Sequence, residues 1–205
     1  VGGIVGNVAH ANAVITGCVS TVNITSGNYA GGLAGRLNNG RISDCYATGS
    51  VNGAVTGGLV GIMENGTVER CYAAGAVSGT SAGGLIGNKT GGTVTASFYD
   101  TQTTNQSTSA DGTAKSTANM KKRETFETAG WDFTDCWKII DGCSYPRLAW
   151  ETWSEEEQIN LDIINDSAAL YITYSPGDSA DGVTGNLTLP KTGENGSTIS
   201  WALTS

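Results

Sequence analysis

The sequence predicts an all-β protein, in which a β-solenoid of about four coils carries an aromatic C-terminal cap and is followed by a partial β-sandwich. Three observations predict this fold: a motif that recurs about every 26 residues over the first hundred, 30 glycines against 3 prolines, and short runs of small and β-branched residues between the glycines. Charged residues make up only 15% of the chain, whereas disordered chains are usually highly charged.

The recurring motif has the pattern small, Gly, Gly, aliphatic, small or aliphatic, Gly. It reads VGGIVG, AGGLAG, TGGLVG and AGGLIG, and a second block follows it as GRISDCYATG, GTVERCYAAG and GTVTASFYD. A unit of about 26 residues is too short to fold alone, so it must bury its apolar face against its neighbours. β-Branched and small residues favour strands, and we expect two or three short strands in each coil.

Equivalent residues of successive coils should stack at the strand spacing of about 4.8 Å. We therefore expect internal columns of aliphatic side chains. They are Leu33, Leu59 and Leu85; Ile42, Val68 and Val94; and, as a partial third column, Val51 and Val77.

These motifs resemble GLUG repeats, which are named for their glycine-aliphatic-glycine core. GGLAG, GGLVG and GGLIG match that core, and the resemblance covers about residues 1–100. It implies an extracellular bacterial module without an activity of its own. GLUG repeats also occur outside the catalytic part of IgA-specific metallopeptidases, but the HExxH signature of those enzymes is absent here.

Three of the five cysteines, Cys18, Cys45 and Cys71, share one column with Ser97. A line of one thiol per coil does not fit a tetrahedral zinc site, so we interpret these cysteines as small buried hydrophobes. A disulfide between neighbouring coils is left open. Cys136 and Cys143 flank WKIIDG; if Asp141-Gly142 forms a two-residue turn, Cys143 faces Ile140, and a disulfide to Cys136 would need a wider loop.

An aromatic column of Tyr46, Tyr72 and Phe98 adjoins the cysteines. Alternation along a strand places it on the opposite face from the cysteine column unless a bulge intervenes. Outward-facing rings could stack on sugars, whereas ladder or core packing is the structural alternative, which we favour.

The repeat ends after Tyr99. Residues 100–122 are polar and predict a long excursion, after which Thr117 could cap a short helix through Phe126. Residues 130–151 concentrate Trp131, Trp137 and Trp150, and this cluster suits the cap that a solenoid needs over its last coil. A carbohydrate platform is the alternative use of these tryptophans. GWDF, W.I.DG and YPRL resemble the tail that follows GLUG arrays.

The C-terminal third begins with Ser154 and Glu157, which have the spacing of a capping box, so we expect a helix or linker over 155–164. Alternating apolar residues then predict strands in ALYITYS, GVTGNLTLP and GSTISWALTS. The pattern GDSA..VT..LTLP with G..GSTI.W resembles the atrophied bacterial Ig-like domain over roughly residues 162–205. Only part of that sandwich fits here, because an Ig-like fold needs about seven strands.

The segment LPKTGEN, residues 189–195, matches the LPxTG signal for sortase anchoring. A working signal is followed by an apolar span and a basic tail, whereas NGSTISWALTS follows here. We interpret the segment as a strand end at Pro190 with a turn at TGENG. The organisation is therefore a solenoid over 1–100, an excursion and cap over 101–151, and a linker with a partial Ig-like domain over 152–205.

Charge and composition exclude several functions. The net charge is −8, and it lies in residues 101–205, so the basic patch that nucleic acid or anionic membranes require is absent. No run reaches the ~18 apolar residues of a membrane span. His10 is the only histidine and no catalytic motif surrounds it. We predict no catalytic residue, no cofactor and no metal ligand.

The coils contribute few carboxylates to glycosidase chemistry, namely Asp44, Glu64, Glu69 and Asp100, and no pair of them recurs. The leading hypothesis is a non-catalytic structural or adhesive region of a larger extracellular bacterial surface protein. The alternative is an accessory, glycan-binding region of a secreted carbohydrate-active enzyme or protease. Partners would be host or cell-surface glycans or proteins. Because Val1 lies inside a glycine motif, we expect the chain to be part of a longer protein.

Overall fold

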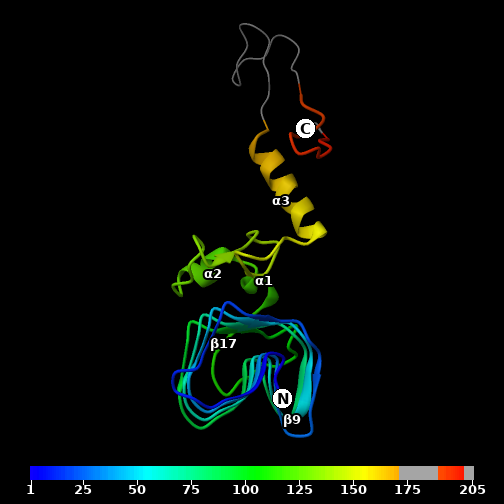
Figure 1. Ribbon diagram of the computed structural model, residues 1–205. Coiled ribbons are helices and arrows are strands. Elements are labelled where there is room, and N and C mark those ends of the chain that lie inside the picture. The colour runs from blue at the N-terminus through cyan, green and yellow to red at the C-terminus, as the bar shows by residue number, and fades with distance from the viewer. Residues whose placement is uncertain (171–188, 201–205) are drawn as a thin grey trace. The chain divides into compact units, whose positions relative to one another are not determined.

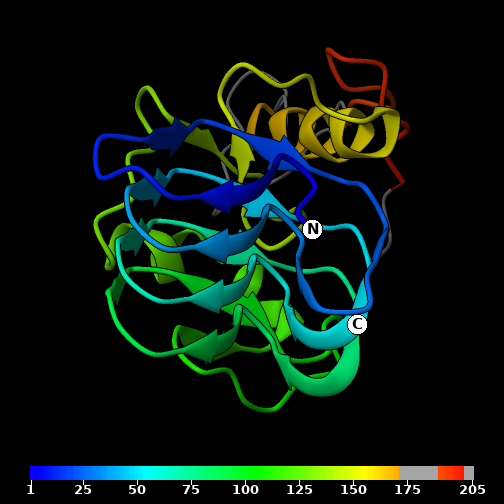
Figure 2. The ribbon, with the colours of Figure 1, turned by 60° about the horizontal axis from the view of Figure 1, so that its bottom comes forward.

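The computed structural model describes residues 1–170 and 189–200. The chain divides into two compact units, Val1–Glu151 and Thr152–Ser205, which are described separately. The first is the predicted β-solenoid of about four coils. Figure 1 looks along the stack, so that equivalent strands lie one behind another, and Figure 2 shows the coils side by side.

The second and third coils each contribute one strand to each of four parallel sheets, which is one more than the two or three strands expected per coil, whereas the fourth coil has three strands. Because the chain turns several corners in each coil, most strands have only two to four residues. The first sheet contains β1 (Val5–Val8), β6 (Ala34–Leu37), β10 (Val60–Met63) and β14 (Ile86–Lys89). The second contains β2 (Val14–Thr16), β7 (Arg41–Ser43), β11 (Thr67–Glu69) and β15 (Thr93–Thr95).

The third sheet contains β3 (Val19–Ser20), β8 (Tyr46–Ala47), β12 (Tyr72–Ala73), β16 (Phe98–Asp100) and β17 (Thr113–Lys115). The fourth contains β4 (Ile24–Thr25), β9 (Val51–Gly57) and β13 (Val77–Gly83), and β5 (Tyr29–Gly31) pairs with β9 as well. Strand partners in the central coils are 26 residues apart, as in Val51 with Val77 and Val60 with Ile86. The period of the sequence repeat therefore equals the offset between paired strands of neighbouring coils.

The predicted aliphatic columns form the core. Leu33, Leu59 and Leu85 are fully buried, as are Ile42 and Val68. The third member of the second column, Val94, is only partly buried, because β15 is the edge strand of its sheet. Complete burial thus needs a coil on both sides.

The paired glycines of the repeat allow backbone to approach backbone. A Cβ added to Gly57 would lie 1.9 Å from the carbonyl oxygen of Val60, and one added to Gly58 would lie 2.2 Å from the carbonyl oxygen of Gly84. The first contact closes a tight turn within the coil, and the second sets the distance to the next coil. Any side chain at these two positions would overlap main-chain atoms that cannot move aside.

The polar stretch after Tyr99 is an incomplete fifth coil, so the predicted excursion is wrong. β17 pairs in parallel with β16, and the carbonyl oxygen of Thr108 accepts from the backbone N–H of Gly84 at 3.0 Å. Ser109 Oγ accepts from the backbone N–H of Ile86 at 2.8 Å. Backbone pairing does not require the side-chain pattern of the repeat, and a polar sequence can therefore close this end of the solenoid.

Asp100, which is fully buried, holds the start of the fifth coil. One carboxylate oxygen accepts from the backbone N–H of Gln102 at 2.8 Å and of Thr103 at 3.3 Å. The other accepts from the hydroxyls of Thr117 at 2.7 Å and Tyr145 at 2.5 Å. Burial, followed by this bond to Asp100, raises the pKa of Tyr145 to about 12. A single carboxylate therefore ties the fifth coil to the segment that follows it.

The Asp100→Asn substitution should lower the free energy of unfolding by about 2–3 kcal/mol, because an amide N–H₂ would then face two hydroxyl donors in a buried site. Urea denaturation measures this loss. The pKa of Tyr145, followed by absorbance at 295 nm, should fall below its wild-type value because a carboxylate that favours the protonated phenol is gone. The exposed Asp135 supplies the matched control, since Asp135→Asn should change stability by less than about 0.5 kcal/mol. Equal losses in the two variants would contradict the assigned role of Asp100.

The tryptophan-rich segment packs against the flank of the solenoid and not over its last coil, which corrects the predicted position of the cap. It contains α1 (Thr117–Met120), α2 (Arg123–Glu127) and the antiparallel pair β18 (Trp137–Lys138) and β19 (Arg147–Leu148). Its buried side chains form one cluster with the aromatic column of the third sheet. The predicted helix is broken at Lys121-Lys122 and is capped by Ser116, one residue before the predicted Thr117.

The second unit begins with α3 (Glu155–Ala168), which is four residues longer than predicted and has the predicted capping box between Ser154 and Glu157. The predicted strands ALYITYS and GVTGNLTLP, and the end of GSTISWALTS, lie almost entirely outside the described residues. The predicted turn at TGENG is present: Thr192 and Thr198 form an antiparallel bridge, and the backbone N–H of Gly193 donates to the carbonyl oxygen of Ser197 at 2.8 Å.

The carboxylate of Asp166 on α3 holds this turn. It accepts from the backbone N–H groups of Asn195 at 2.7 Å and Ser197 at 3.1 Å. A bond from the Ser197 side chain, followed by that from the Asn195 backbone, lowers the pKa of Asp166 to about 2. In the structure, LPKTGEN therefore runs into a turn that is fixed by a helix residue.

The charged form of Asp166 should hold the turn at all pH values above the ordinary aspartate pKa of ~3.9, and the contribution should disappear as the pH falls through about 2. The amide chemical shifts of Asn195 and Ser197 in an NMR titration measure this transition. We expect a midpoint near pH 2. The Asp166→Asn variant should lack the transition, and a midpoint near the ordinary value would contradict the hydrogen-bonding scheme.

Candidate functional site

The cysteine column lies at a corner of every coil. The residue before each column member has a left-handed backbone, with φ values of 60° at Gly17, 53° at Asp44, 46° at Arg70 and 47° at Ala96. The column side chain then donates to the carbonyl oxygen two residues earlier. These bonds run from Cys18 to Thr16 at 3.2 Å, from Cys45 to Ser43 at 3.0 Å, from Cys71 to Glu69 at 3.2 Å and from Ser97 to Thr95 at 2.8 Å.

This bond explains why serine replaces cysteine in the fourth coil. Ser97 Oγ accepts from the backbone N–H of Cys71 at 3.1 Å, as Cys45 Sγ accepts from the backbone N–H of Cys18 at 3.4 Å. The position requires a small side chain that can both donate and accept. Size was predicted from the sequence, but the hydrogen bond and the left-handed residue were not. The glycine at position 17 was the only signal for them.

The left-handed corner should make Ala96→Gly stabilising by about 0.5 kcal/mol. Glycine removes the strain of a positive φ in the folded state, and the higher entropy of the unfolded chain offsets only part of this gain. Urea denaturation measures the change. Ala114 lies exposed in β17 and has no positive φ, so Ala114→Gly should instead destabilise by about 0.5–1 kcal/mol. Destabilisation by both substitutions would show that the corner is not strained.

The thiols are packing groups in this structure. Cys45 and Cys71 are fully buried, as predicted, and all five cysteines are free. Burial raises the pKa of Cys18 and Cys71, whereas the neighbouring thiol of Cys71 lowers the pKa of Cys45. Within residues 1–170 and 189–200, His, Cys, Asp and Glu form no group of three that could hold a metal ion.

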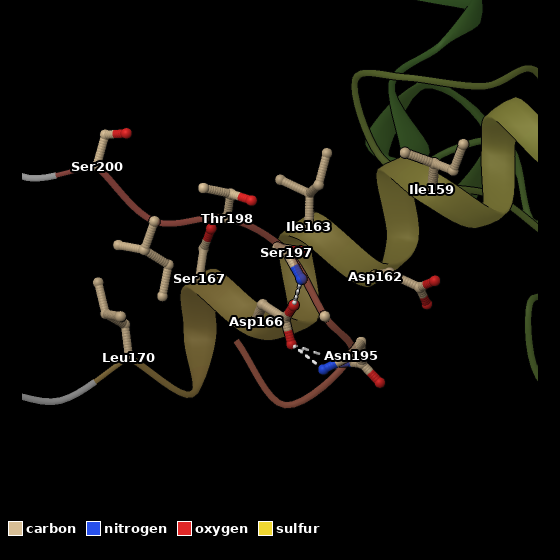
Figure 3. Close-up of a pocket in the computed structure, with 12 residues that line it drawn as sticks. Ile159, Asp162, Ile163, Asp166, Ser167, Leu170, Asn195, Ser197, Thr198 and Ser200 are labelled. Atoms are coloured by element: carbon tan, nitrogen blue, oxygen red, sulfur yellow. Dashed lines mark hydrogen bonds between the residues drawn. The ribbon is translucent and has the colours of Figure 1, made fainter. Parts of the chain in front are cut away.

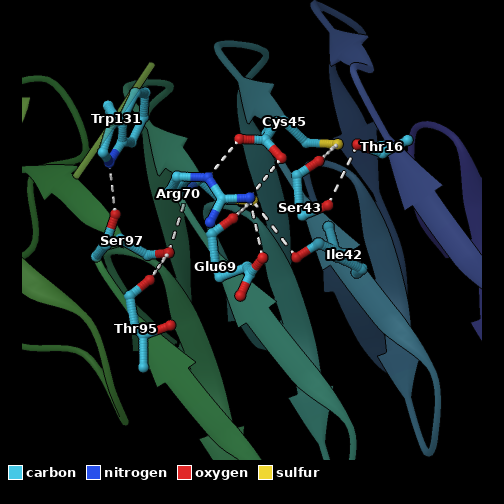
Figure 4. A network of polar contacts seen from close by, with 12 residues as sticks. Thr16, Ile42, Ser43, Cys45, Glu69, Arg70, Thr95, Ser97 and Trp131 are labelled. Atoms are coloured by element: carbon cyan, nitrogen blue, oxygen red, sulfur yellow. Dashed lines mark hydrogen bonds and ion pairs between the residues drawn. The ribbon is translucent and has the colours of Figure 1, made fainter. Parts of the chain in front are cut away.

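Three acidic residues of the coils form ion pairs with arginines of other coils, and Figure 4 shows the contacts around Glu69 and Arg70. Glu64 pairs with Arg36 at 2.5 Å, and Asp44 pairs with Arg70 at 2.7 Å. Glu69 pairs with Arg41 of the preceding coil and with Arg70. Partly exposed pairs contribute only ~0–1 kcal/mol each, so their main effect is to favour one register of neighbouring coils.

The aromatic column points away from the cysteine column, as alternation predicted. It is nevertheless buried, because the cap covers it: Tyr46, Tyr72 and Phe98 are 4%, 1% and 5% exposed. The Tyr46 and Tyr72 rings stack with centroids 4.7 Å apart, and the Tyr72 hydroxyl donates to the carbonyl oxygen of Pro146 at 2.8 Å. These rings are not available to a sugar, so the packing that we favoured for this column is confirmed and the sugar-stacking alternative is wrong.

The three tryptophans of the cap differ in their exposure to solvent. Trp131 and Trp137 are 4% and 1% exposed and pack on the aromatic column, whereas Trp150 is 68% exposed. Burial raises the pKa of Cys136 to about 11. Asp141-Gly142 lie in a turn, with the Cys143 N–H donating to the carbonyl oxygen of Ile140 at 2.9 Å. The predicted two-residue hairpin is nevertheless wrong, because Lys138 pairs with Arg147 and residues 139–146 form a wider loop between β18 and β19. A platform of three exposed tryptophans is therefore absent from the described cap.

Each unit has an open hollow on its surface. In the second unit a cavity of about 540 Å³ lies between α3 and residues 195–200, and Figure 3 shows Asp166 bonded to the turn at its edge. In the first unit a groove of about 310 Å³ lies over the first two coils. His10, the sole histidine, is exposed, and its Nδ1 accepts from the Asn12 backbone N–H at 3.1 Å; it does not line the groove.

Two stretches of the chain are similar to known protein families. The family model of the GLUG motif matches residues 26–52, which run from the residue after β4 to the second residue of β9. This stretch of the solenoid is similar to a GLUG motif. The model of the atrophied bacterial Ig domain matches residues 163–205, so both predicted resemblances are confirmed in the predicted order. Neither family description names an activity.

A GLUG-containing chain of this kind fits a region of a bacterial surface protein. A Gly-rich membrane protein of Evansella cellulosilytica is 55% identical over 51 residues, which are 25% of this chain and 6% of the relative. The match thus spans a small part of a much longer protein. No solved structure matches the chain. Within the described residues, helices long and apolar enough to cross a bilayer are absent.

Proposed function

We propose that this chain is a non-catalytic structural region of an extracellular bacterial surface protein, in which the GLUG solenoid serves as a stalk and presentation surface and the Ig-like unit as a spacer. The proposal rests on the contacts that the carboxylates of the coils make. Glu64, Asp44 and Glu69 each bind an arginine of another coil, and Asp100 accepts four hydrogen bonds. These groups hold coils together and are not left for chemistry.

A modular stalk should tolerate removal of one whole coil. Deleting residues 58–83 would join Gly57 to Gly84 and keep the repeat in phase, because Gly57 pairs in register with Gly83 and Gly84 is therefore equivalent to the deleted Gly58. The shortened protein should keep its β-sheet circular dichroism and a cooperative melt. Deleting residues 58–70, half a coil, is the matched control and should abolish folding, because every following strand would lose its register.

Placement at the surface is tested in the producing bacterium. Antibodies raised against this chain should label intact cells, and trypsin added outside should remove the label. If only permeabilised cells are labelled, the proposal of a surface stalk is wrong. If the one-coil deletion fails to fold while the half-coil deletion folds, the modular part of the proposal is wrong.

A further inference from the structure

The groove of the first unit is an open hollow over its first two coils. Its walls come from the segment before and at the start of β5, with Ser26, Asn28 and Tyr29, and from β1 and β6, with Asn7 and Arg36. Gly6 and Gly35 also line it and add no side chains. All of these residues belong to the first two coils.

The aromatic ring in this groove is exposed. Tyr29 has an exposed fraction of 42%, and the positions in register with it are Val55 and Ser81. The tyrosine is therefore not part of a stacked aromatic column that would account for it structurally. An exposed ring at the edge of a hollow offers an apolar face to a ligand.

The polar side chains around the ring are uncharged or neutralised, and the N-terminal amino group of Val1, which also lines the groove, donates to the carbonyl oxygen of Tyr29 at 2.6 Å. Asn7 and Asn28 are exposed, and within the described part of the chain their side-chain amides make no hydrogen bond to protein. The guanidinium of Arg36 donates twice to Glu64, at 3.0 and 2.5 Å. Two free carboxamides thus present donors and acceptors to the groove, while the charge of the Arg36 side chain is balanced by Glu64.

We propose that this groove binds one ring of a neutral polysaccharide. An aromatic face matches the C–H face of a pyranose, and carboxamides match its hydroxyl groups because each amide both donates and accepts. The balanced charge of Arg36 and Glu64 favours a neutral sugar over an acidic one. A groove of about 310 Å³ lies at the lower end of the ~300–1,000 Å³ range of small-ligand sites, so it suits a single ring. The site goes beyond the structural role, and the stalk does not depend on it.

The test uses cellohexaose, chitohexaose, mannohexaose and, as the acidic comparison, hexagalacturonate, each titrated into the full chain and followed by NMR. At least one neutral oligosaccharide should bind with a Kd below about 10 mM and shift the side-chain amide signals of Asn7 and Asn28. Tyr29→Ala should weaken that binding about tenfold, whereas Tyr29→Phe should keep it within about threefold.

A substitution that fills the groove distinguishes a loss of binding from a loss of folding. A Cβ at Gly6 meets no atom within 4 Å, so Gly6→Leu should preserve the melting temperature while occupying the groove and abolishing binding. Ser81→Ala, in register with Tyr29 but outside the groove, should bind like wild type. Absence of binding by all three neutral sugars, stronger binding of hexagalacturonate, or unchanged binding in both Gly6→Leu and Tyr29→Ala would overturn the proposal.

Discussion

The Gly57→Ala substitution should destabilise the solenoid by about 4 kcal/mol or more, beyond the ~1–3 kcal/mol of ordinary overpacking. The added methyl group would lie 1.9 Å from the carbonyl oxygen of Val60 and 2.6 Å from the backbone nitrogen of Gly87. Both atoms belong to main chain that is fixed by pairing with neighbouring coils. The clash can be relieved only by moving a coil, which breaks hydrogen bonds on both sides of it.

Urea denaturation followed by circular dichroism measures the loss. Gly27→Ala is the matched control, because a Cβ at Gly27 meets nothing within 4 Å and Gly27 has no positive φ. It should leave stability unchanged or raise it by about 0.5 kcal/mol through the entropy of the unfolded chain. If Gly57→Ala behaved like Gly27→Ala, the paired glycines would not be required by close backbone approach.

The Trp137→Ala substitution should cost about 3–5 kcal/mol, in line with the truncation of a buried tryptophan. Trp137 is 1% exposed and joins the cap to the solenoid: its ring centroid lies 4.3 Å from that of Trp131 and 6.3 Å from those of Tyr46 and Tyr72. Removing the indole leaves a cavity between the two surfaces, so the cap should detach more readily.

Limited proteolysis with mass spectrometry measures the detachment, since cleavage between residues 117 and 148 should become faster while the coils remain protected. Trp150→Ala is the matched control: its side chain is 68% exposed, and the change should stay within about 0.5 kcal/mol. Equal cleavage rates in the two variants would mean that the cap does not depend on Trp137.

The repeat made much of the fold predictable. Spacing alone placed Leu33, Leu59 and Leu85 in one internal column, and alternation alone placed Tyr46 and Tyr72 opposite the cysteines; all five side chains lie where they were expected. These predictions succeeded because in-register stacking brings equivalent residues together whatever the shape of the coil.

The fifth coil and the side-on cap were not predictable from the repeat. Residues 101–115 join the solenoid through main-chain hydrogen bonds and through single polar side chains such as Ser109, and neither follows the pattern of the repeat. The cap covers the aromatic column through contacts between residues far apart in sequence, as between Tyr46 and Trp137. Whether that column faced solvent or protein depended on this docking.

The candidate groove was likewise hidden in the sequence. Tyr29, Asn7 and Arg36 belong to different strands and match no motif, and only the folding of β5 beside β1 and β6 brings them to one hollow. The sequence by itself determined the coil length, the register and the inward columns, because these follow from a local pattern repeated every 26 residues. The tertiary structure decided which outward side chains are covered and which remain open to a ligand, because that depends on where a non-repeating segment packs.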